Sequence, residues 1–376
     1  MNFDFSADQG LLRDELRKFF VNEVPLARSR TLMEQRGTHD AAAWQGLAGL
    51  GATALMLPEA CGGAGLGALE LCVLAEEAGR QLAPLPLAST MYLAAQALLL
   101  GADEAQQARW LARIAQGEPA ALAAPLGEEA NPGLLRYAGG LLNGDAPLAS
   151  DGEAARVAVV LARDEAGAPC WVAAELDATV TRRRLNTLDG ARPYAALGFA
   201  ATHAERLAHA DDALSLLQRV RDRAAVLLAF EQLGGADAAL EMAAAYARER
   251  KAFGRTIGSY QGIKHKLADL YTANQLARAH CWYGAWALEK DARQAAPAAE
   301  LALAAAAARV AATDAFSLAA QENIQTHGGM GVTWETDCHL FYRRARQYAV
   351  MLGSVHEWRE RLVVALASQL DMENSA

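Results

Sequence analysis

Cysteine is scarce in this chain of 376 residues, and its placement follows no pattern. The number of cysteines is odd and none stands in a CxxC pair, so neither a disulfide framework nor a zinc site is indicated. A reducing cytoplasm fits this usage. The five are Cys61, Cys72, Cys170, Cys281 and Cys338.

An excess of basic residues is also lacking, since 35 lysines and arginines face 44 acidic residues and the net charge is -9. This balance disfavours a nucleic-acid partner or an anionic membrane, although a local basic patch can still bind phosphates. The N-terminal segment carries charges throughout, without the apolar core of a signal peptide. The apolar stretch Leu82–Leu100 is interrupted by Pro84 and Pro86, so we expect no membrane span there. We expect a soluble, cytoplasmic protein.

The order of patterns along the chain is helical, then β, then helical. An apolar 3.6-residue period over 5–25, with Ser6 as the cap, predicts a first helix, and further helices are expected at 41–50, 67–80, 88–99 and 103–116. The β texture includes the apolar runs Val157–Leu161 and Cys170–Ala174, with turn signals at Asn143-Gly144, Asp151-Gly152 and Asp189-Gly190.

The sequence therefore predicts a mainly α protein with a β insert. The expected domains are an N-terminal helical domain (1–118), a middle antiparallel β domain (119–210) and a C-terminal four-helix bundle (211–370), followed by a frayed tail (371–376). Alanine runs over 296–312 indicate close helix packing within the bundle.

Three motifs carry candidate chemistry. The first, PEACGGAG from Pro58 to Gly65, is a glycine-rich loop between two helices; without a βαβ unit around it, it is no dinucleotide fingerprint. By itself it favours a plain interhelical loop.

The second motif, YARERKAFGR, runs from Tyr246 to Arg255 and is followed by Gln261 and His265. Its basic cluster, at a predicted helix end near Gly254, consists of Arg248, Arg250, Lys251 and Arg255. Two interpretations stay open: the guanidiniums grip a pyrophosphate, or they complement the negative end of the helix dipole.

The third motif, QTHGGMG, runs from Gln325 to Gly331 at the end of another helix. Two adjacent glycines let backbone N–H groups contact a ligand directly, and the Gln325 amide offers both a donor and an acceptor. His327 has no partners at metal-ligand spacing, which favours a structural, hydrogen-bonding histidine.

In this order and spacing, and with Tyr342-Arg343-Arg344 after the third, the motifs resemble the acyl-CoA dehydrogenase family over essentially the whole chain. That resemblance implies a FAD-dependent oxidoreductase that desaturates an acyl-CoA thioester and passes electrons to an electron-transfer flavoprotein. It further implies tetramers that form through the helical bundles, with FAD at a subunit interface. The cofactor residues it implies are Arg250, Phe253, Gln325, Gly328 and Gly329.

Two segments depart from the family pattern. Where most members carry the glutamate that removes the α-proton, this chain has Leu352, which cannot accept a proton. The loop that lines the flavin ring in the family corresponds to 123–129, AAPLGEE, and the segment with the flavin-packing tryptophan corresponds to 148–150, where only Ser150 keeps a hydroxyl. Ser150 is therefore the one cofactor candidate on the flavin-ring side.

A replacement base is available in the helix before Tyr246. Glu231 lies on a predominantly apolar face of the predicted helix, together with Leu227, Gly234, Ala238 and Met242. Desolvation there would raise the pKa of its carboxylate toward the range of a general base. Family variants carry the base on this helix, at a position that matches Ala224. The alternative is that Glu231 pairs with an arginine in a subunit interface.

A narrower resemblance rests on AFEQLGG around Glu231, on Asp189-Gly190 and on LGSVHEWRER after Met351. It points to the small subunit of pimeloyl-CoA-dehydrogenase-type enzymes, in which a larger acyl-CoA dehydrogenase subunit shares the site. Three hypotheses follow: a catalytic subunit that uses Glu231 or its partner's base, a non-catalytic companion that supplies the adenine half of the FAD site, and an acyl-CoA-binding protein without redox chemistry. A homo-oligomer and a hetero-oligomer both stay open.

Overall fold

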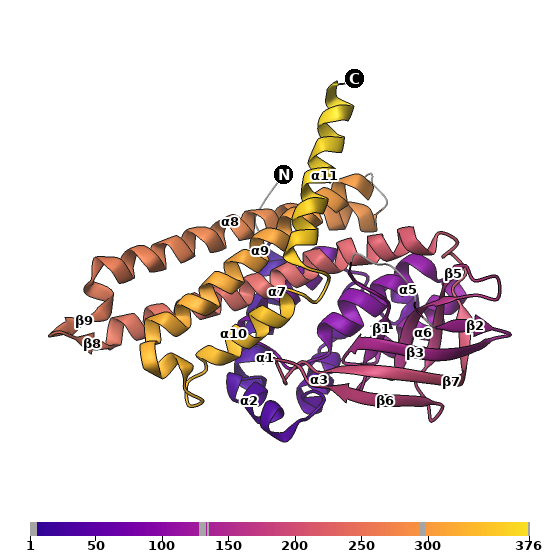
Figure 1. Ribbon diagram of the computed structural model, residues 1–376, viewed down its shortest axis with the longest axis horizontal. Coiled ribbons are helices and arrows are strands. Elements are labelled where there is room, and N and C mark those ends of the chain that lie inside the picture. Colours follow the sequence, from indigo (N-terminus) through magenta and orange to yellow (C-terminus); the bar gives the residue numbers. More distant parts are fainter. Residues whose placement is uncertain (1–5, 128–132, 134, 294–297, 375–376) are drawn as a thin grey trace. The chain divides into compact units, whose positions relative to one another are not determined.

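The computed structural model describes residues 6–127, 133, 135–293 and 298–374, with side chains described as far as 368. Helices precede and follow a β region, as the sequence predicts (Figure 1). The helices before it are α1 (Ala7–Glu23), α2 (Leu26–Gln35), α3 (Ala41–Gly49), α4 (Ala68–Arg80), α5 (Ala95–Gly101) and α6 (Glu104–Ala115), with short helices η1 (Ala52–Ala54), η2 (Glu59–Cys61) and η3 (Ala88–Ala94).

The β region and the C-terminal helices complete the fold. The strands are β1 (Ala120–Ala123), β2 (Arg136–Ala138), β3 (Leu141–Ser150), β4 (Val157–Arg163), β5 (Pro169–Glu175), β6 (Val180–Leu185) and β7 (Tyr194–Arg206). They are followed by α7 (Ala213–Glu249), β8 (Lys251–Ala252), β9 (Arg255–Thr256), η4 (Ile257–Ser259), α8 (Gln261–Ala292), α9 (Ala298–His327), η5 (Gly328–Val332), α10 (Cys338–Tyr348) and α11 (Val355–Asn374).

Two compact units divide the chain, and each is discontinuous in sequence. The helical unit comprises 1–30, 72–83 and 225–376, and the mixed unit comprises 31–71 and 84–224. Helices α2, α4 and α7 each contribute residues to both. The consecutive domain boundaries expected from the sequence stay a prediction.

Side-chain caps fix where several helices begin. Ser6 and Gln9 form a capping box at the start of α1, and Asp103 and Gln106 form another at α6. The Asp40 carboxylate accepts a hydrogen bond from the Ala43 N–H at the start of α3. Each cap satisfies backbone donors that the first helical turn leaves unpaired. Helix α2, which begins directly after Pro25, was not predicted from the sequence.

The strands of the mixed unit close into a ring. Strand β4 pairs with β2, β2 with β3, β3 with β7, β7 with β5, and β5 again with β4, while β6 adds to β7. Most pairings are antiparallel, as expected. Strand β1, however, joins β4 in parallel, with Ala120 opposite Val157. Closure removes free strand edges from the ring.

One turn prediction is wrong. Asn143-Gly144 lies inside β3, where the register with β7 shifts between Leu142 and Gly144 and the Asn143 side chain accepts a hydrogen bond from the Ala201 N–H. The turn between β2 and β3 is made instead by Gly139 and Gly140, both with positive φ. An Asn-Gly pair suits a bulge as well as a turn, because both need a residue that tolerates unusual backbone angles.

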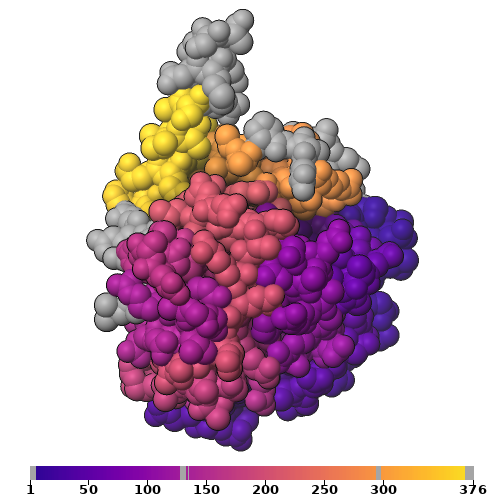
Figure 2. All heavy atoms as spheres, turned by 90° about the vertical axis from the view of Figure 1, so that its right-hand side faces the viewer, coloured from indigo at the N-terminus to yellow at the C-terminus, as the bar shows by residue number. Residues whose placement is uncertain are grey.

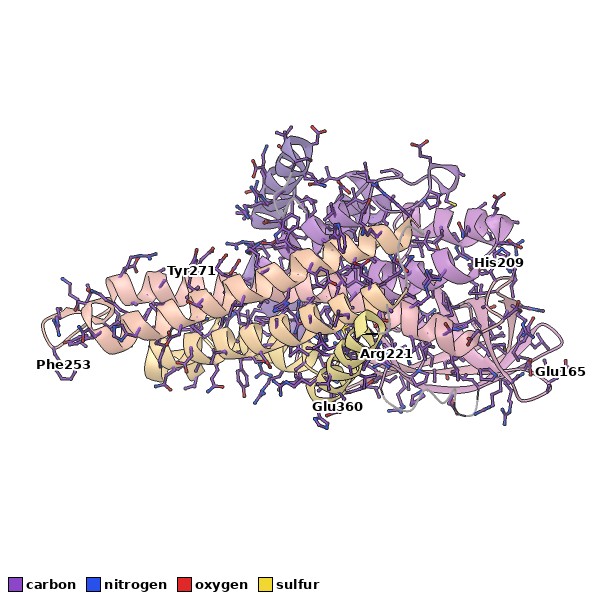
Figure 3. All side chains as sticks on the ribbon, turned by 90° about the horizontal axis from the view of Figure 1, so that it is seen from above. Glu165, His209, Arg221, Phe253, Tyr271 and Glu360 are labelled. Carbon is purple, nitrogen blue, oxygen red and sulfur yellow. The ribbon has the colours of Figure 1, made fainter. Side chains whose placement is uncertain are left out.

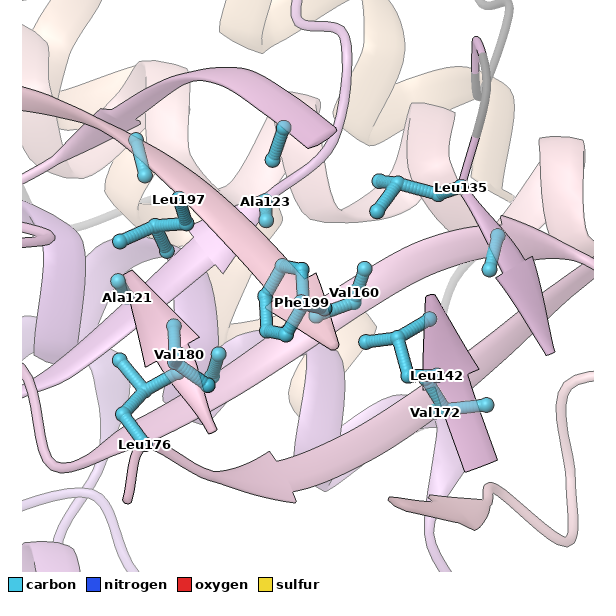
Figure 4. Packing of buried hydrophobic residues seen from close by; sticks show 14 of the residues in the cluster. Ala121, Ala123, Leu135, Leu142, Val160, Val172, Leu176, Val180, Leu197 and Phe199 are labelled. Carbon is cyan, nitrogen blue, oxygen red and sulfur yellow. The ribbon is translucent and has the colours of Figure 1, made fainter. Parts of the chain in front are cut away.

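Small apolar side chains fill the centre of the β region (Figure 4). Alternate residues of each strand point inward, as the two-residue period of a strand requires. Strand β4 contributes Ala158, Val160 and Ala162, and β7 contributes Ala195, Leu197 and Phe199.

The C-terminal helices α7, α8, α9 and α11 form a bundle in the helical unit (Figure 1). Helix α9 packs along α8, with the Ala308 Cβ close to the backbone of Gly284, so the alanine run serves close helix packing as predicted. By length and composition the stretch Ala298–Val332 is apolar enough to cross a membrane, since an 18-residue window within it has a mean hydropathy of 1.4. More than half of that window, 56%, is buried, and core helices of globular proteins meet the same criterion.

Helix α11 packs against α9, and its C-terminal part extends away from the other helices of its unit (Figure 1, Figure 2). It continues to Asn374, beyond the point where the sequence predicts a frayed tail. Residues 375 and 376 lie outside the described residues. Among the side chains of α11 described as far as residue 368, the large exposed apolar ones are Val363, Val364 and Leu366.

Helices α4 and α7 cross with their backbones in contact. A Cβ added to Gly79 would lie 1.9 Å from the Glu231 carbonyl oxygen, and one added to Gly234 would lie 2.0 Å from the Glu76 carbonyl oxygen. Only glycine fits at both positions of this crossing. The next residue, Gly235, faces the Phe316 ring of α9. The crossing fixes where Glu231 lies in the helical unit.

Candidate cofactor site

The second motif forms the end of α7 and a tight hairpin. The Arg250 N–H donates to the Tyr246 carbonyl at 2.8 Å, and the chain then turns between β8 and β9 through Phe253 and Gly254. Both turn residues have positive φ, 50° and 82°, as a type I′ hairpin requires. The Phe253 ring is 97% exposed at the tip (Figure 3).

Other side chains stiffen this hairpin. The Tyr260 hydroxyl donates to the Ala252 carbonyl at 3.0 Å, and the Arg255 guanidinium lies 4.0 Å from the centre of the Tyr260 ring. Arg255 is therefore engaged within the hairpin. Arg250 is exposed, and among the described residues its guanidinium makes no ion pair or hydrogen bond. Of the basic cluster, Arg250 is thus available to a phosphate group.

The third motif forms the end of α9, and its glycines face open space. Gln325, Gly328 and Gly329 are all exposed. Gly328 has a φ of 61°, which favours glycine, whereas Gly329 has no such requirement. A Cβ at either position would meet no atom of the described chain within 4 Å. Gly331, by contrast, packs against the Ile324 carbonyl. The surface above the two exposed glycines can accept a closely approaching ligand.

A stacked ring pair joins the two motifs. The Tyr246 and His327 rings lie 4.1 Å apart between centroids and 25° from parallel. The first ring belongs to α7 and the second to α9, so Arg250 and Phe253 share one end of the helical unit with Gln325, Gly328 and Gly329. A guanidinium, an amide and two exposed glycines that let a ligand approach the backbone lie at one place, and this set fits the diphosphate and adenosine portion of FAD.

Glu231 lies in the interior of the helical unit and is 1% exposed. Its carboxylate accepts a hydrogen bond from the Tyr348 hydroxyl at 2.5 Å, and the Arg344 guanidinium lies 4.0 Å away. Arg344 also donates to the Leu82 carbonyl at 3.0 Å. This arrangement corresponds to the ion-pair alternative weighed for Glu231, with the arginine supplied by the same chain. Its catalytic role stays a prediction.

A second buried polar group lies beside this pair. Arg309 of α9 donates to the Gln232 side chain, to the Thr313 hydroxyl and to the Tyr348 carbonyl. The Gln232 amide also donates to Thr313, at 3.1 Å. Sequence reasoning missed Arg309, Arg344 and Tyr348. A lone arginine within the alanine run of α9 was the available signal, since an isolated charge in an apolar helix needs a partner.

Leu352, at the position where the family carries its base, is packed into the same interior. It is 1% exposed, and its carbonyl accepts a hydrogen bond from the Trp358 indole N–H at 2.9 Å. Leu352 has no carboxylate, and the Glu231 carboxylate is buried against Tyr348 and Arg344.

Ser150 belongs to the mixed unit, at the end of β3. Its hydroxyl donates to the Asp151 carboxylate at 3.3 Å, and that carboxylate also pairs with the buried Arg192 at 3.3 Å. The Ser150 hydroxyl is thus engaged in a local polar cluster, and a role toward the flavin ring stays a prediction. In the altered loop at 123–129, Glu128 and Glu129 lie outside the described residues.

The glycine-rich loop after Pro58 has a structural role. Gly62 and Gly65 have positive φ, and a Cβ on Gly63 would overlap the Leu57 carbonyl. Each glycine is explained by the turn itself, which agrees with the plain-loop interpretation.

Comparisons with known proteins extend over nearly the whole chain. The family model "Acyl-CoA dehydrogenase, N-terminal domain" matches residues 6–118, and "Acyl-CoA dehydrogenase, C-terminal domain" matches residues 214–365. The acyl-CoA dehydrogenase IpdE2 of Mycobacterium tuberculosis is 33% identical over 356 residues, which cover 94% of this chain and 96% of IpdE2.

Solved structures with the same fold include two that are at least 25% identical to this chain. A chain of the ChsE4-ChsE5 complex from Mycobacterium tuberculosis is 25% identical with a TM-score of 0.85, covering 98% of this chain and 99% of that one. A chain of a Tcur3481-Tcur3483 steroid ACAD variant is 28% identical with a TM-score of 0.84, covering 97% of this chain and 99% of that one.

Proposed function

Because this chain belongs to the acyl-CoA dehydrogenase family, whose members are FAD-dependent oxidoreductases acting on CH–CH groups, we propose that it works as one subunit of a hetero-oligomeric acyl-CoA dehydrogenase. In this proposal the chain supplies the adenine half of a shared FAD site. A larger subunit supplies the flavin-ring pocket and the base that removes the α-proton of an acyl-CoA thioester.

One contrast carries the proposal. The five adenine-side residues are presented outward at one end of the helical unit, whereas Glu231 and Leu352 are buried in its interior. A single chain that performed the whole reaction would need a carboxylate able to reach substrate. In this chain the candidate carboxylate, that of Glu231, instead accepts a hydrogen bond from Tyr348 and lies beside Arg344.

The chemistry assigns different tasks to the two chains. The thioester carbonyl acidifies the α-proton, so a carboxylate within hydrogen-bond reach can remove it. FAD, when bound, supplies the acceptor for the hydride that leaves Cβ. The part of this chain is to hold the cofactor: Arg250 neutralises diphosphate charge, Gln325 makes directional hydrogen bonds, and Gly328 and Gly329 allow close backbone approach.

The names of the similar structures support a partnership of unlike chains. One is a complex of ChsE4 with ChsE5, and the other joins Tcur3481 with Tcur3483 as a steroid ACAD. We propose that the present chain likewise assembles with a different chain into a hetero-oligomer. In this proposal an electron-transfer flavoprotein accepts the electrons. A cytoplasmic location is part of the proposal, supported by five free, buried cysteines.

Native mass spectrometry tests the division of the site. The chain is purified alone and after co-expression with a family member from the same organism that carries glutamate at the position of Leu352. We expect no FAD in the chain alone, and in the complex fewer FAD molecules than chains. A yellow, active homo-oligomer of this chain would refute the proposal.

A variant of Glu231 separates the two sources of the base. In the complex, Glu231→Gln should leave turnover largely intact, because the amide can still accept a hydrogen bond from Tyr348. If turnover is abolished while FAD stays bound, Glu231 is the base and the chain is catalytic.

A further inference from the structure

We propose that Tyr246 and His327 form a positioning pair that holds the two halves of the adenine-side site in register. This inference rests on the proposed function. It assigns to the two residues no contact with substrate or cofactor; they act through the neighbours that they align.

The geometry of the pair is that of a defined stack. A centroid distance of 4.1 Å and an interplanar angle of 25° place one ring face over the other. Because the two rings come from different helices, the stack joins the end of α7 to the end of α9.

The orientation of the imidazole is fixed from its own helix. His327 Nδ1 lies 2.8 Å from the Asn323 carbonyl oxygen, one helical turn earlier. A carbonyl oxygen only accepts, so Nδ1 carries the proton and donates it. The ring is thus held in its plane by a hydrogen bond and against its face by Tyr246. A histidine that was expected only to hydrogen-bond therefore has two structural contacts.

The pair is directly connected to the residues that would face the cofactor. The Tyr246 carbonyl accepts the hydrogen bond of the Arg250 N–H, and His327 stands between Gln325 and Gly328. Both segments lie at helix termini, where backbone order is weakest and ends fray. A contact between the two ends restricts their relative motion, so the guanidinium and the amide are presented at a fixed separation.

Replacing the phenol by phenyl gives a clean control. Among the described residues, the Tyr246 hydroxyl makes no hydrogen bond. Tyr246→Phe therefore keeps every contact that the stack needs, whereas Tyr246→Leu keeps apolar bulk and removes the aromatic face. If the stack positions the site, the two variants will differ in cofactor retention.

The experiment measures the FAD dissociation constant of the co-expressed complex by release of flavin fluorescence. Tyr246→Leu is expected to raise that constant about tenfold, with a melting temperature close to that of the wild type, and Tyr246→Phe is expected to match the wild type. Equal FAD affinity in all three proteins overturns the inference.

Three further variants keep the result interpretable. Arg250→Ala tests the proposed function itself. If this variant binds FAD as tightly as the wild type, the assignment of the adenine-side residues is wrong. If Arg250→Ala binds FAD more weakly while Tyr246→Leu binds it as tightly as the wild type, only the positioning pair is rejected. Should Tyr246→Leu not fold, His327→Phe and His327→Leu replace it. The phenylalanine variant then keeps FAD affinity and the leucine variant loses it, and equal affinities overturn the inference.

Discussion

At the tip of the β8–β9 hairpin, Phe253 has a φ of 50° and a ring that is almost fully exposed. Both properties cost stability, because a bulky side chain disfavours the left-handed region and an exposed ring gains nothing from burial. Asn-Gly is the usual pair at this turn, so a Phe-Gly pair indicates that the ring serves something outside the chain. The resemblance to the family assigns that role to FAD.

Phe253→Asn should therefore stabilise the protein and weaken cofactor retention. Relief of the strained backbone is expected to raise Tm by about 1 °C, as measured by differential scanning calorimetry of the chain alone. FAD retention in the complex should fall. Phe253→Leu, which keeps the strain and loses the ring, serves as the control, and a lower Tm for the asparagine variant contradicts the argument.

His39 gives the mixed unit a pH dependence. Burial lowers the pKa of its imidazole, although Asp151 and Asp40 act in the opposite direction. The folded state therefore binds fewer protons than the unfolded chain as pH falls through the ordinary value of about 6.5. The contribution of His39 to stability is complete above that pH and is lost below it.

We expect His39→Asn to lose less thermal stability than the wild type between pH 7.5 and pH 5.5. Melting curves at both pH values measure the difference. His209→Asn is the matched control, because His209 is an exposed histidine of the same unit (Figure 3). A fall in Tm of the same size in the wild type and in His39→Asn would remove the role of His39.

At the scale of elements, the crossing of α4 over α7 depends on two glycines, Gly79 and Gly234, each of which faces a backbone carbonyl of the other helix. Neither has positive φ, so the reason for glycine is space and not conformation. An added methyl group would force the helices apart over their whole contact, since backbone atoms cannot move aside locally.

Gly234→Ala is accordingly expected to destabilise the protein by about 3 kcal/mol, measured by denaturant unfolding. Gly262→Ala provides the comparison in another helix, because a Cβ there meets nothing within 4 Å. Alanine is the better helix former, so that variant should be neutral or slightly more stable. Equal effects of the two substitutions would exclude the close crossing.

The elements differ in how well the sequence predicts them. Capped, periodic helices such as α1 and α6 and the apolar strands β4 and β5 follow from local patterns, and the structure has them near the expected bounds. The parallel pairing of β1 and the ion pair between Glu231 and Arg344 depend on contacts between residues distant in sequence. Periodicity places a residue on a face, but it does not identify the side chain that the face meets.

The candidate site shows the same limit. The motifs predict which residues share chemistry, and the Tyr246–His327 stack brings two of those motifs together in one place. The stack itself could not be predicted, because neither ring stands out in its own segment. Leu352 could be recognised as a departure only by comparison with the family pattern, since a buried leucine alone carries no signal.

Over the molecule as a whole, all five cysteines are buried, the most accessible being Cys61 at 5%. Burial raises the pKa of Cys338 to about 11 and also raises the pKa of Cys281. At pH 8 these thiols stay protonated, and the thiolate is the reactive form.

The native chain should therefore react with dithiobis-nitrobenzoate (DTNB) at pH 8 far more slowly than the unfolded chain, which should titrate all five thiols. The absorbance time course with and without guanidinium measures both. Rapid labelling of a thiol in the native chain would show that a part of the molecule opens, and peptide mapping would identify which part.

The interleaving of the two units sets an order in time. Helix α1 pairs with α4 through Arg17 and Glu77, and α4 crosses α7 at Gly79, so the residues of α1 belong to one unit with residues made about 200 positions later. At roughly 10 residues per second, that delay is on the order of 20 s. The mixed unit has all its residues by position 224 and can complete its ring first. Helix α1 is thus synthesised well before the C-terminal helices of its unit, and its apolar face stays incompletely covered in that interval.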